Sequence, residues 1–139
     1  MPSLIYNSAV RDEAIGNIDY DTDTFWVQLV TSAYVENKDT HTKRSDVTNE
    51  VTGTGYTAGG QAITVTVAAV DAANDRVVIN FGAVTWPSST ITARKAVVYK
   101  RRGGAAAADE LVYVNDFGAD VISTNGTFTL PASTITKQN

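Results

Sequence analysis

The feature that most restricts the fold of this chain is an alternation of apolar and polar residues that recurs between Thr24 and Leu130. Successive side chains of an extended strand point to opposite faces of a sheet, so every second residue of such a run lies on the same side. In the run TFWVQLVTS, one face carries Phe25, Val27 and Leu29. The run therefore predicts a core strand of an antiparallel sheet.

Two more alternating runs surround a short polar segment and predict a β-hairpin. QAITVTVAAV at 61–70 and RVVINFGAVTW at 76–86 are joined by DAAND at 71–75. Asp and Asn favour the tight turns that connect neighbouring strands. The side chains that we expect to face the core are Ile63, Val65, Val67, Val77, Ile79 and Phe81.

The second half of the chain predicts further strands. One is expected at 90–102, after a break in the chain at 87–89, where Pro is followed by two Ser residues. GGAAAAD at 103–109 predicts a flexible connector, and ELVYVNDFG at 110–118 alternates again. Two last strands are expected on either side of an Asn-Gly turn at 125–126.

Together these elements predict an all-β fold. About seven or eight strands with turns every 8 to 12 residues or so are typical of an antiparallel β-sandwich, and we expect a jelly-roll-like arrangement. The whole chain, 1–139, is expected to form a single domain. A polar N-terminal arm at 1–8 and a C-terminal tail at 131–139 are expected to lie outside the sandwich.

A single short helix is expected near the N-terminus. Asn7 or Ser8 can cap the segment AVRDEAI, and Gly16 can end it. This is the one stretch whose residues favour a helix start over a strand.

Composition and charge narrow the classes of function. The chain has 139 residues, no cysteine and a net charge of −4, and this acidic balance argues against a nucleic-acid-binding protein. No apolar run approaches the roughly 20 residues that cross a bilayer, and no secretory signal is visible, so we expect synthesis in a cytoplasm and no membrane partner. Charged residues make up 19% of the chain, below the roughly 25% of ordinary soluble domains, which suits a protein that packs against partners.

The segment DYDTD is the candidate metal site. Asp19, Asp21 and Asp23 have the spacing of the first calcium ligands of an EF-hand loop. The remainder of the loop does not fit, because Thr24 replaces the turn glycine and Val30 replaces the bidentate glutamate. We interpret the segment as a solvated turn whose carboxylates bond nearby backbone, and we expect no metal and no cofactor.

The chain offers little for catalysis. His41 is the only histidine, so a Ser-His-Asp relay would have to use it. It lies in the most polar segment of the chain, NKDTHTKRSD, which predicts an exposed loop histidine instead of a catalytic group. We therefore expect a protein that is not an enzyme.

The glycine-rich segment TGTGYTAGG at 52–60 does not match a phosphate-binding loop. Such a loop needs a strand before it and a helix after it, whereas a strand follows here. The glycines predict a wide loop that Tyr56 anchors by packing. Trp26 and Trp86 could form a sugar-stacking platform, although buried aromatic anchors are commoner.

Basic residues gather at the end of the predicted strand at 90–102. This pattern fits contact with an acidic partner surface or with phosphates, and it also fits a solvated strand end that keeps a sheet edge from pairing with other chains. Binding of nucleic acid is the weakest option in an acidic protein. The residues concerned are Arg94, Lys95, Lys100, Arg101 and Arg102.

Three stretches carry a likeness to known proteins: DVTNEVTGTGYTAGG, STITARKAVVYK and LVYVNDFGADVISTNGTFTL. The chain resembles, over nearly its whole length, a family of small virion proteins of tailed bacteriophages. The resemblance implies a capsid cement, or decoration, protein: a jelly-roll-like subunit that binds the outside of the assembled head and stabilises it. It also implies that the major capsid protein is the partner, that the subunit is a homo-oligomer on the capsid surface, and that its location is the virion exterior.

A decoration subunit contacts its neighbours through segments outside the β core. The arm 1–8, the loop 36–60 and the tail 131–139 are therefore the expected contact segments. The individual residues that we predict to touch a partner are Leu4, Ile5, Tyr6, Lys43, Arg44, Tyr56, Arg101 and Arg102.

Alternatives to a cement protein remain open. A tail, fibre or head–tail joining component could be built on the same sandwich. A carbohydrate-binding module would use Trp26, Trp86 or Tyr56, and an esterase would require His41.

Overall fold

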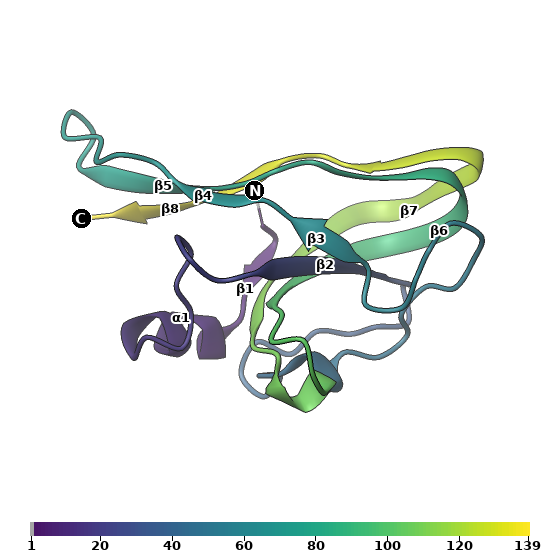
Figure 1. The fold of residues 1–139 in the computed structure, drawn as a ribbon, viewed down its shortest axis with the longest axis horizontal. Coiled ribbons are helices and arrows are strands. Elements are labelled where there is room, and N and C mark those ends of the chain that lie inside the picture. The colour runs from purple at the N-terminus through teal and green to yellow at the C-terminus, as the bar shows by residue number, and fades with distance from the viewer. Residues whose placement is uncertain (1) are drawn as a thin grey trace.

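A computed structural model describes residues 2–139, and it confirms an all-β protein with two antiparallel sheets and one short α-helix. The five-stranded sheet has the order β1-β7-β6-β2-β3, and the three-stranded sheet has the order β4-β5-β8 (Figure 1). The strands are β1 (Leu4–Ile5), β2 (Phe25–Val30), β3 (Gln61–Ile63), β4 (Val65–Val67), β5 (Arg76–Phe81), β6 (Val84–Lys100), β7 (Leu111–Leu130) and β8 (Ser133–Gln138). The helices are α1 (Asn7–Ala14) and two 3-10 turns, η1 (Arg44–Asp46) and η2 (Ala106–Ala108).

One two-stranded ribbon runs through both sheets. In the three-stranded sheet Phe81 pairs with Ser133, and in the five-stranded sheet Val84 pairs with Leu130. The register is therefore the same on both sides of a short interruption, where Pro131 has no N–H to donate. We call this continuous pairing of β5 and β6 with β7 and β8 the long ribbon.

The long ribbon bends so that its two halves lie in different layers. In Figure 1 it runs along the upper layer, turns over at the right and returns as the middle of the lower layer. The pairing of β6 with β7 shifts register around Ser89, opposite Gly126. Ser88 and Asn125, with φ of 50° and 46°, adopt left-handed backbone at this place. Bulges of this kind bend a strand and increase its twist, which explains where the ribbon turns.

Two predictions from the sequence are contradicted at these bulges. The break expected at 87–89 lies inside β6, and the Asn-Gly turn expected at 125–126 lies inside β7. Both predictions were wrong because the turn-forming residues bend two continuous strands and do not reverse the chain. The jelly-roll strand order is not confirmed, since the strands divide into sheets of five and three.

The hairpin predicted around DAAND is confirmed as β4 and β5, with Val67 opposite Ile79. The run 61–70 holds two strands, however: β3 pairs with β2 and β4 pairs with β5, so the chain changes sheets at Thr64. The connector 103–109 contains η2, and the strand before it is longer than expected because β6 begins at Val84.

The helix is present and Gly16 follows its end as predicted, but the predicted N-cap, Asn7 or Ser8, is wrong. Tyr6 is the N-cap residue, without a side-chain cap, and Asn7 donates from its side-chain amide to the Asp39 carboxylate (2.6 Å). Gly16 follows the helix with φ of 83°, the left-handed conformation that ends helices. Within residues 2–139, no helix is long and apolar enough to cross a membrane.

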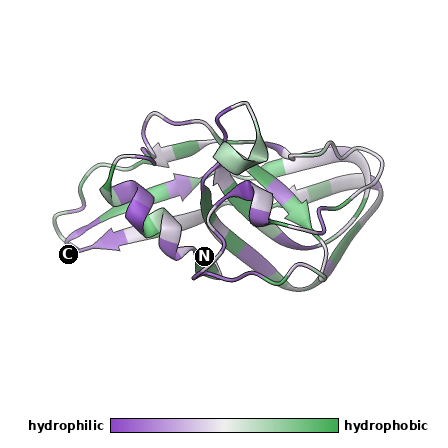
Figure 2. Ribbon diagram, turned by 90° about the horizontal axis from the view of Figure 1, so that it is seen from below, coloured by the Kyte–Doolittle hydropathy of each residue, from purple (hydrophilic) through white to green (hydrophobic). Residues whose placement is uncertain are grey.

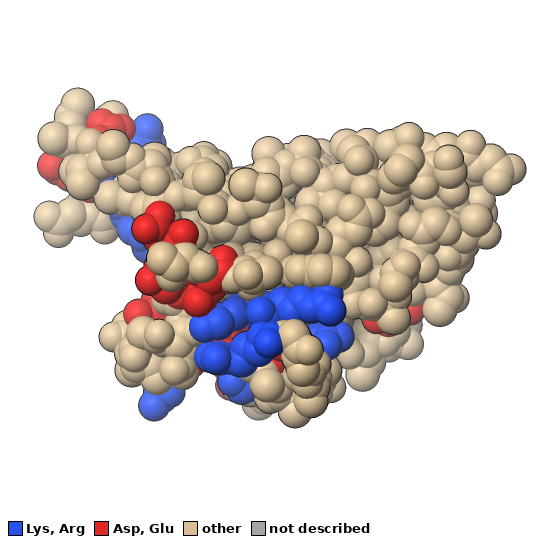
Figure 3. Space-filling view, in the orientation of Figure 1, with Lys and Arg blue, Asp and Glu red and all other residues tan. Residues whose placement is uncertain are grey.

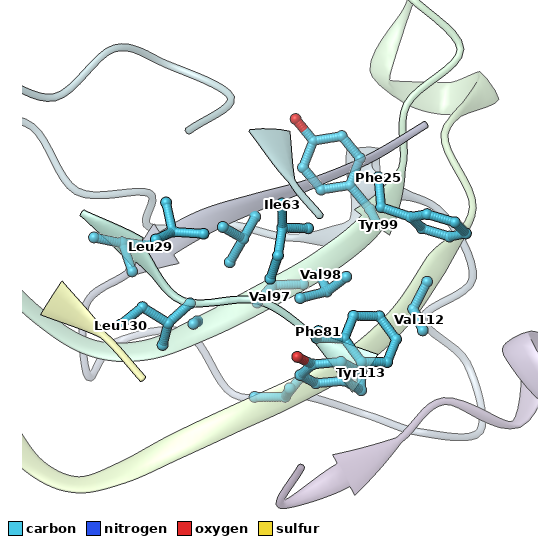
Figure 4. Close-up of a cluster of buried hydrophobic side chains, with 14 of the residues drawn as sticks. Phe25, Leu29, Ile63, Phe81, Val97, Val98, Tyr99, Val112, Tyr113 and Leu130 are labelled. Carbon is cyan, nitrogen blue, oxygen red and sulfur yellow. The ribbon is translucent and has the colours of Figure 1, made fainter. Parts of the chain in front are cut away.

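The core lies between the two layers (Figure 4). Phe81 in the upper layer meets Tyr113 in the lower layer edge to face, with 4.9 Å between ring centres. The Tyr113 hydroxyl also lies 2.6 Å from the Ser133 Oγ, so the layers share a hydrogen bond. Apolar and polar segments alternate along the strands, as Figure 2 shows, and this alternation turns apolar side chains of the two layers toward each other.

The other face of the five-stranded sheet is covered by the chain segments 31–60 and 101–110. Tyr99 donates from its hydroxyl to the Gly59 carbonyl (2.7 Å), and Lys95 donates from Nζ to the Tyr34 carbonyl (2.9 Å). The centre of β6 is therefore buried on both faces, from Lys95 to Tyr99. This cover explains why an apolar run without strict alternation occurs in β6.

Because Phe81 joins the two layers, we expect Phe81→Ala to lower the free energy of unfolding by about 3 to 5 kcal/mol. The substitution removes a buried ring and its contact with Tyr113. Urea unfolding followed by circular dichroism measures the change. Val121→Ala, at an exposed position of β7, is the matched control and should unfold like the wild type; equal losses for the two variants would contradict this account of the core.

Candidate functional site

The predicted contacts in the arm 1–8 lie against the chain's own sheet. Leu4 and Ile5 form β1, which pairs with β7, and both side chains are half-buried against the core. Tyr6 is completely buried, and its hydroxyl lies 2.8 Å from the Tyr34 hydroxyl. The prediction that Tyr6 touches a partner is therefore wrong, because its own chain encloses the side chain.

Tyr34 also contacts His41, the only histidine in the sequence. The Tyr34 hydroxyl lies 2.9 Å from Nδ1 of His41, and the two rings stack with 5.7 Å between their centres. The backbone N–H of Asn37 donates to the same nitrogen (3.3 Å). His41 is half-buried, not fully exposed as predicted, and these contacts close the loop between Asn37 and His41.

The predicted basic contacts come together in space, although they are far apart in the sequence. Lys43 and Arg44 lie at η1, and Arg101 and Arg102 follow the end of β6. The main chain joins the two segments, since Arg44 donates from its backbone N–H to the Asp109 carbonyl (2.8 Å). We call these four residues, with Lys100, the basic patch; Figure 3 shows basic side chains gathered in the lower middle of this face of the molecule.

Two buried carboxylates, those of Asp109 and Glu110, bind arginine side chains of the basic patch from its inner side. Asp109 accepts from Arg44 Nε (2.8 Å), and Glu110 accepts two hydrogen bonds from Arg102, from Nε (2.6 Å) and Nη2 (3.0 Å). The Asp109 and Glu110 side chains are each 1% exposed, whereas that of Arg102 is 44% exposed. The hydrogen bonds from Arg102 to Glu110 raise the pKa of that guanidinium. The acidic groups are thus hidden, and the guanidinium groups form the outer surface.

Aromatic rings fix two of these guanidinium groups further. The Arg101 guanidinium lies 3.7 Å from the centre of the Trp26 ring, and that of Arg44 lies 4.9 Å from the centre of the Tyr99 ring. Such stacking limits the freedom of a long side chain and is favourable in itself. The basic patch is therefore a preorganised surface that can contact acidic groups at little cost in conformational entropy.

The segment DYDTD at 19–23, which we call the acidic segment, borders the basic patch (Figure 3). Its carboxylates do not converge: Asp19 accepts from the Asp21 backbone N–H (2.9 Å), and Asp23 accepts from the Asp19 N–H (2.8 Å) and forms an ion pair with Lys100 (2.8 Å). The hydrogen bond from Asp21 lowers the pKa of Asp19. Among residues 2–139, no three His, Cys, Asp or Glu side chains are grouped so that they could hold a metal ion. The segment has the local backbone bonds that its sequence predicted.

The glycine-rich loop is packed tightly onto the strands. Tyr56 donates from its hydroxyl to Glu50 (2.6 Å) and accepts from the Leu29 N–H (3.0 Å), and burial raises the pKa of this hydroxyl. Tyr56 therefore anchors the loop, as predicted, and its hydroxyl is not free for a partner. Gly60 has φ of 82°, and a Cβ there would collide with the Val27 carbonyl oxygen. This glycine is needed for a close approach of two backbones.

The tryptophans do not form a sugar-binding platform. Trp86 is 1% exposed and packs edge to face against Phe128. Trp26 is half-buried, and Arg101 covers its ring. The favoured interpretation, a buried aromatic anchor, is confirmed for Trp86, and both rings are in contact with neighbours within the chain.

A recess lies between α1 and the projecting end of the three-stranded sheet. Its volume is about 550 Å³, and its apolar wall includes Ile18, Val67 and Val77. An ion pair between Lys137 and Glu13 (2.6 Å) crosses it and ties the sheet to the helix. The ion pair therefore joins the two walls of the recess.

Comparisons with known proteins give no relatives. No protein-family model, no curated protein and no solved structure matches the chain.

Because Asp109 orients the basic patch from a buried position, we expect Asp109→Ala to lower the free energy of unfolding by about 2 to 3 kcal/mol. The substitution leaves Arg44 Nε and the Arg102 N–H without their acceptor. Urea unfolding measures the loss. Asp21→Ala, in the exposed acidic segment, is the control and should leave stability unchanged; a neutral Asp109→Ala would show that the carboxylate is not needed.

The close approach at Gly60 gives a separate test. We expect Gly60→Ala to destabilise the fold by more than about 2 kcal/mol, because both a left-handed φ and a collision with Val27 are imposed. Gly16→Ala is the matched control: Gly16 has φ of 83° with open space around it, so only the left-handed cost of about 1 kcal/mol applies. Thermal unfolding of both variants measures the difference, and equal losses would contradict the close packing of this loop.

Proposed function

We propose that this chain is a structural subunit of a bacteriophage virion that binds the outside of the assembled head and stabilises it. The observation that carries the proposal is the basic patch, whose partly exposed cations are held by buried carboxylates and by aromatic rings on a β framework. Two segments that we predicted to touch a partner, at 43–44 and 101–102, meet in this one surface. The likeness of the sequence to small virion proteins of tailed bacteriophages supports the same role.

A subunit of this kind acts by mass action. If it binds the assembled shell and not the separated capsid subunits, its binding free energy favours the assembled state. Many copies on one shell add their effects, so each contact can be weak. A rigid subunit loses little conformational entropy on binding, and the packed loop at 52–60 and the bridged basic patch supply that rigidity.

The acidic surface that the basic patch would contact belongs, in this proposal, to the major capsid protein. Contacts between exposed charges weaken as salt is added, because the screening length falls to about 10 Å at 0.1 M salt. Binding to heads should therefore decrease at higher ionic strength. A contact that depends on apolar burial would not decrease in this way.

The basic patch can be tested on isolated heads that lack this subunit. We expect the chain to co-sediment with heads, and Arg101→Gln to weaken binding about tenfold, since one half-buried cation and its stacking on Trp26 are lost without touching a buried carboxylate. Arg11→Gln, at an exposed basic position on α1, is the matched control and should bind normally. Equal binding of the two variants to heads would show that the basic patch is not part of the interface.

Location on the particle separates this proposal from its alternative. Labelled antibody against the chain should decorate the surface of the head. Labelling confined to the tail, the fibres or the head–tail junction would contradict the cement role and favour a component of those structures.

A further inference from the structure

The edges of the two sheets offer a second interaction surface, which does not depend on the proposed function. Four strands lie at sheet edges in the described chain: β1, β3, β4 and β8. The first three have two or three residues each, whereas β8 has six, Ser133–Gln138. β8 is therefore the longest of the four edge strands, and no strand of the described chain pairs with its outer side. Figure 2 shows it at the rim of its sheet, beside the end marked C.

The hydrogen bonds around β5 show which atoms of β8 are free. The Ala68 N–H donates to Val78, and the Gly82 N–H donates to Thr64, so even-numbered residues of β5 bond to β4. The odd-numbered residues of β5 then bond to β8, at Ser133, Ile135 and Lys137.

The alternate residues of β8 consequently turn their backbone groups away from the sheet. Thr134, Thr136 and Gln138 direct three N–H and three C=O groups to the free side. Their side chains share the outer face of the sheet with Thr66 and Asn80.

This edge lacks the devices that usually keep edges apart. Sheet edges in soluble proteins are commonly blocked by charges, prolines or bulges, because unpaired backbone groups attract other strands. The segment from Ser133 to Thr136 has no charge and no proline, and three of its residues are β-branched, which favours extended pairing. The one charge of β8, on Lys137, points to the inner side, where it pairs with Glu13 (2.6 Å).

We propose that β8 pairs in antiparallel fashion with β8 of a second copy of this chain, around a two-fold axis at Thr136. Two identical strands that pair antiparallel are self-complementary, which is the property of a two-fold interface. With the axis at Thr136, this residue opposes its own copy, and Thr134 opposes Gln138 of the other copy. All three free residues then form hydrogen-bonded pairs, and each pair exchanges two backbone hydrogen bonds.

The side chains fit this arrangement. Thr136 meets Thr136 and Thr134 meets Gln138, and facing polar pairs of this kind stabilise neighbouring strands. No like charges oppose each other, because Lys137 lies opposite Ile135 of the other copy and is paired with Glu13 on the inner side. The two three-stranded sheets would join into one continuous sheet of six strands. A strand from another protein could use the same edge but would not produce this symmetric contact.

The absence of cysteine from the chain allows a direct test by cross-linking. In a hydrogen-bonded antiparallel pair, opposing Cα atoms lie about 5.5 Å apart, within the range that a disulfide spans. We expect oxidised Thr136→Cys to form a covalent dimer at least about tenfold faster than Thr66→Cys, which places a thiol on the same face but on β4. Equal rates for the two variants would overturn the proposal.

The register is tested by mixing two other variants. Thr134→Cys and Gln138→Cys should cross-link when mixed, because these positions oppose each other across the axis, and neither should cross-link with itself at a comparable rate. Cross-linking of each variant alone as fast as the mixture would exclude the register centred on Thr136.

The backbone bonds are tested by sedimentation of the wild type and two substitutions. The wild type should be a dimer, Thr136→Ala should remain one, and Thr136→Pro should raise the dimer dissociation constant about thirtyfold, because both N–H donors at the axis are lost. Circular dichroism shows whether Thr136→Pro is folded; if it is not, the cysteine variants decide the question. A monomeric wild type at the concentrations used for cross-linking, or a folded Thr136→Pro that dimerises normally, would overturn the proposal.

Discussion

The continuous register of the long ribbon is the constraint on which the remaining structure depends. One ladder carries the chain from the three-stranded sheet into the five-stranded sheet, since Phe81 opposite Ser133 and Val84 opposite Leu130 belong to the same register. A slip of one residue would turn every side chain of one strand to the opposite face. It would remove Phe81 from Tyr113 and break the hydrogen bond that Tyr113 makes to Ser133. The spacing of the layers and the filling of the core are therefore set by a single pairing.

The position of the basic patch also depends on the long ribbon. Asp109 and Glu110 directly precede β7, where the chain enters the core, so their positions are fixed by the strand that follows. A buried carboxylate is costly unless it is paired and hydrogen-bonded, and the guanidinium groups of Arg44 and Arg102 supply that compensation. The cations are thus held outward by groups that the fold already requires. A surface built in this way is as rigid as the sheet beneath it.

The sequence predicted the elements that depend on local pattern, and it failed where distant pairing decides the outcome. Strand β2, the hairpin of β4 and β5, and the helix were visible in the periodicity and in turn residues. The residues at 87–89 and 125–126 carry ordinary turn signals, yet each faces the other across a ladder and forms a bulge. Tyr6 was predicted to touch a partner because it lies in the arm 1–8, whereas its hydroxyl lies against that of Tyr34, far away in the sequence. The basic contacts were named from the sequence, but their buried partners Asp109 and Glu110 were missed, since an acidic pair after a small-residue connector resembles a solvated loop.

The two proposed contacts lie on different parts of the molecule, and this separation has a physical consequence. The basic patch lies at η1 and the end of β6, while the free edge of β8 belongs to the three-stranded sheet, so neither contact uses residues of the other. A pair of chains joined through β8 would carry two basic patches on one rigid body. The second patch would then bind at a high effective concentration once the first is bound, which strengthens attachment without any new contact. Such a gain requires acidic sites on the shell at the spacing that the two-fold axis imposes, so dimerisation would select the shell geometry as well as raise the affinity.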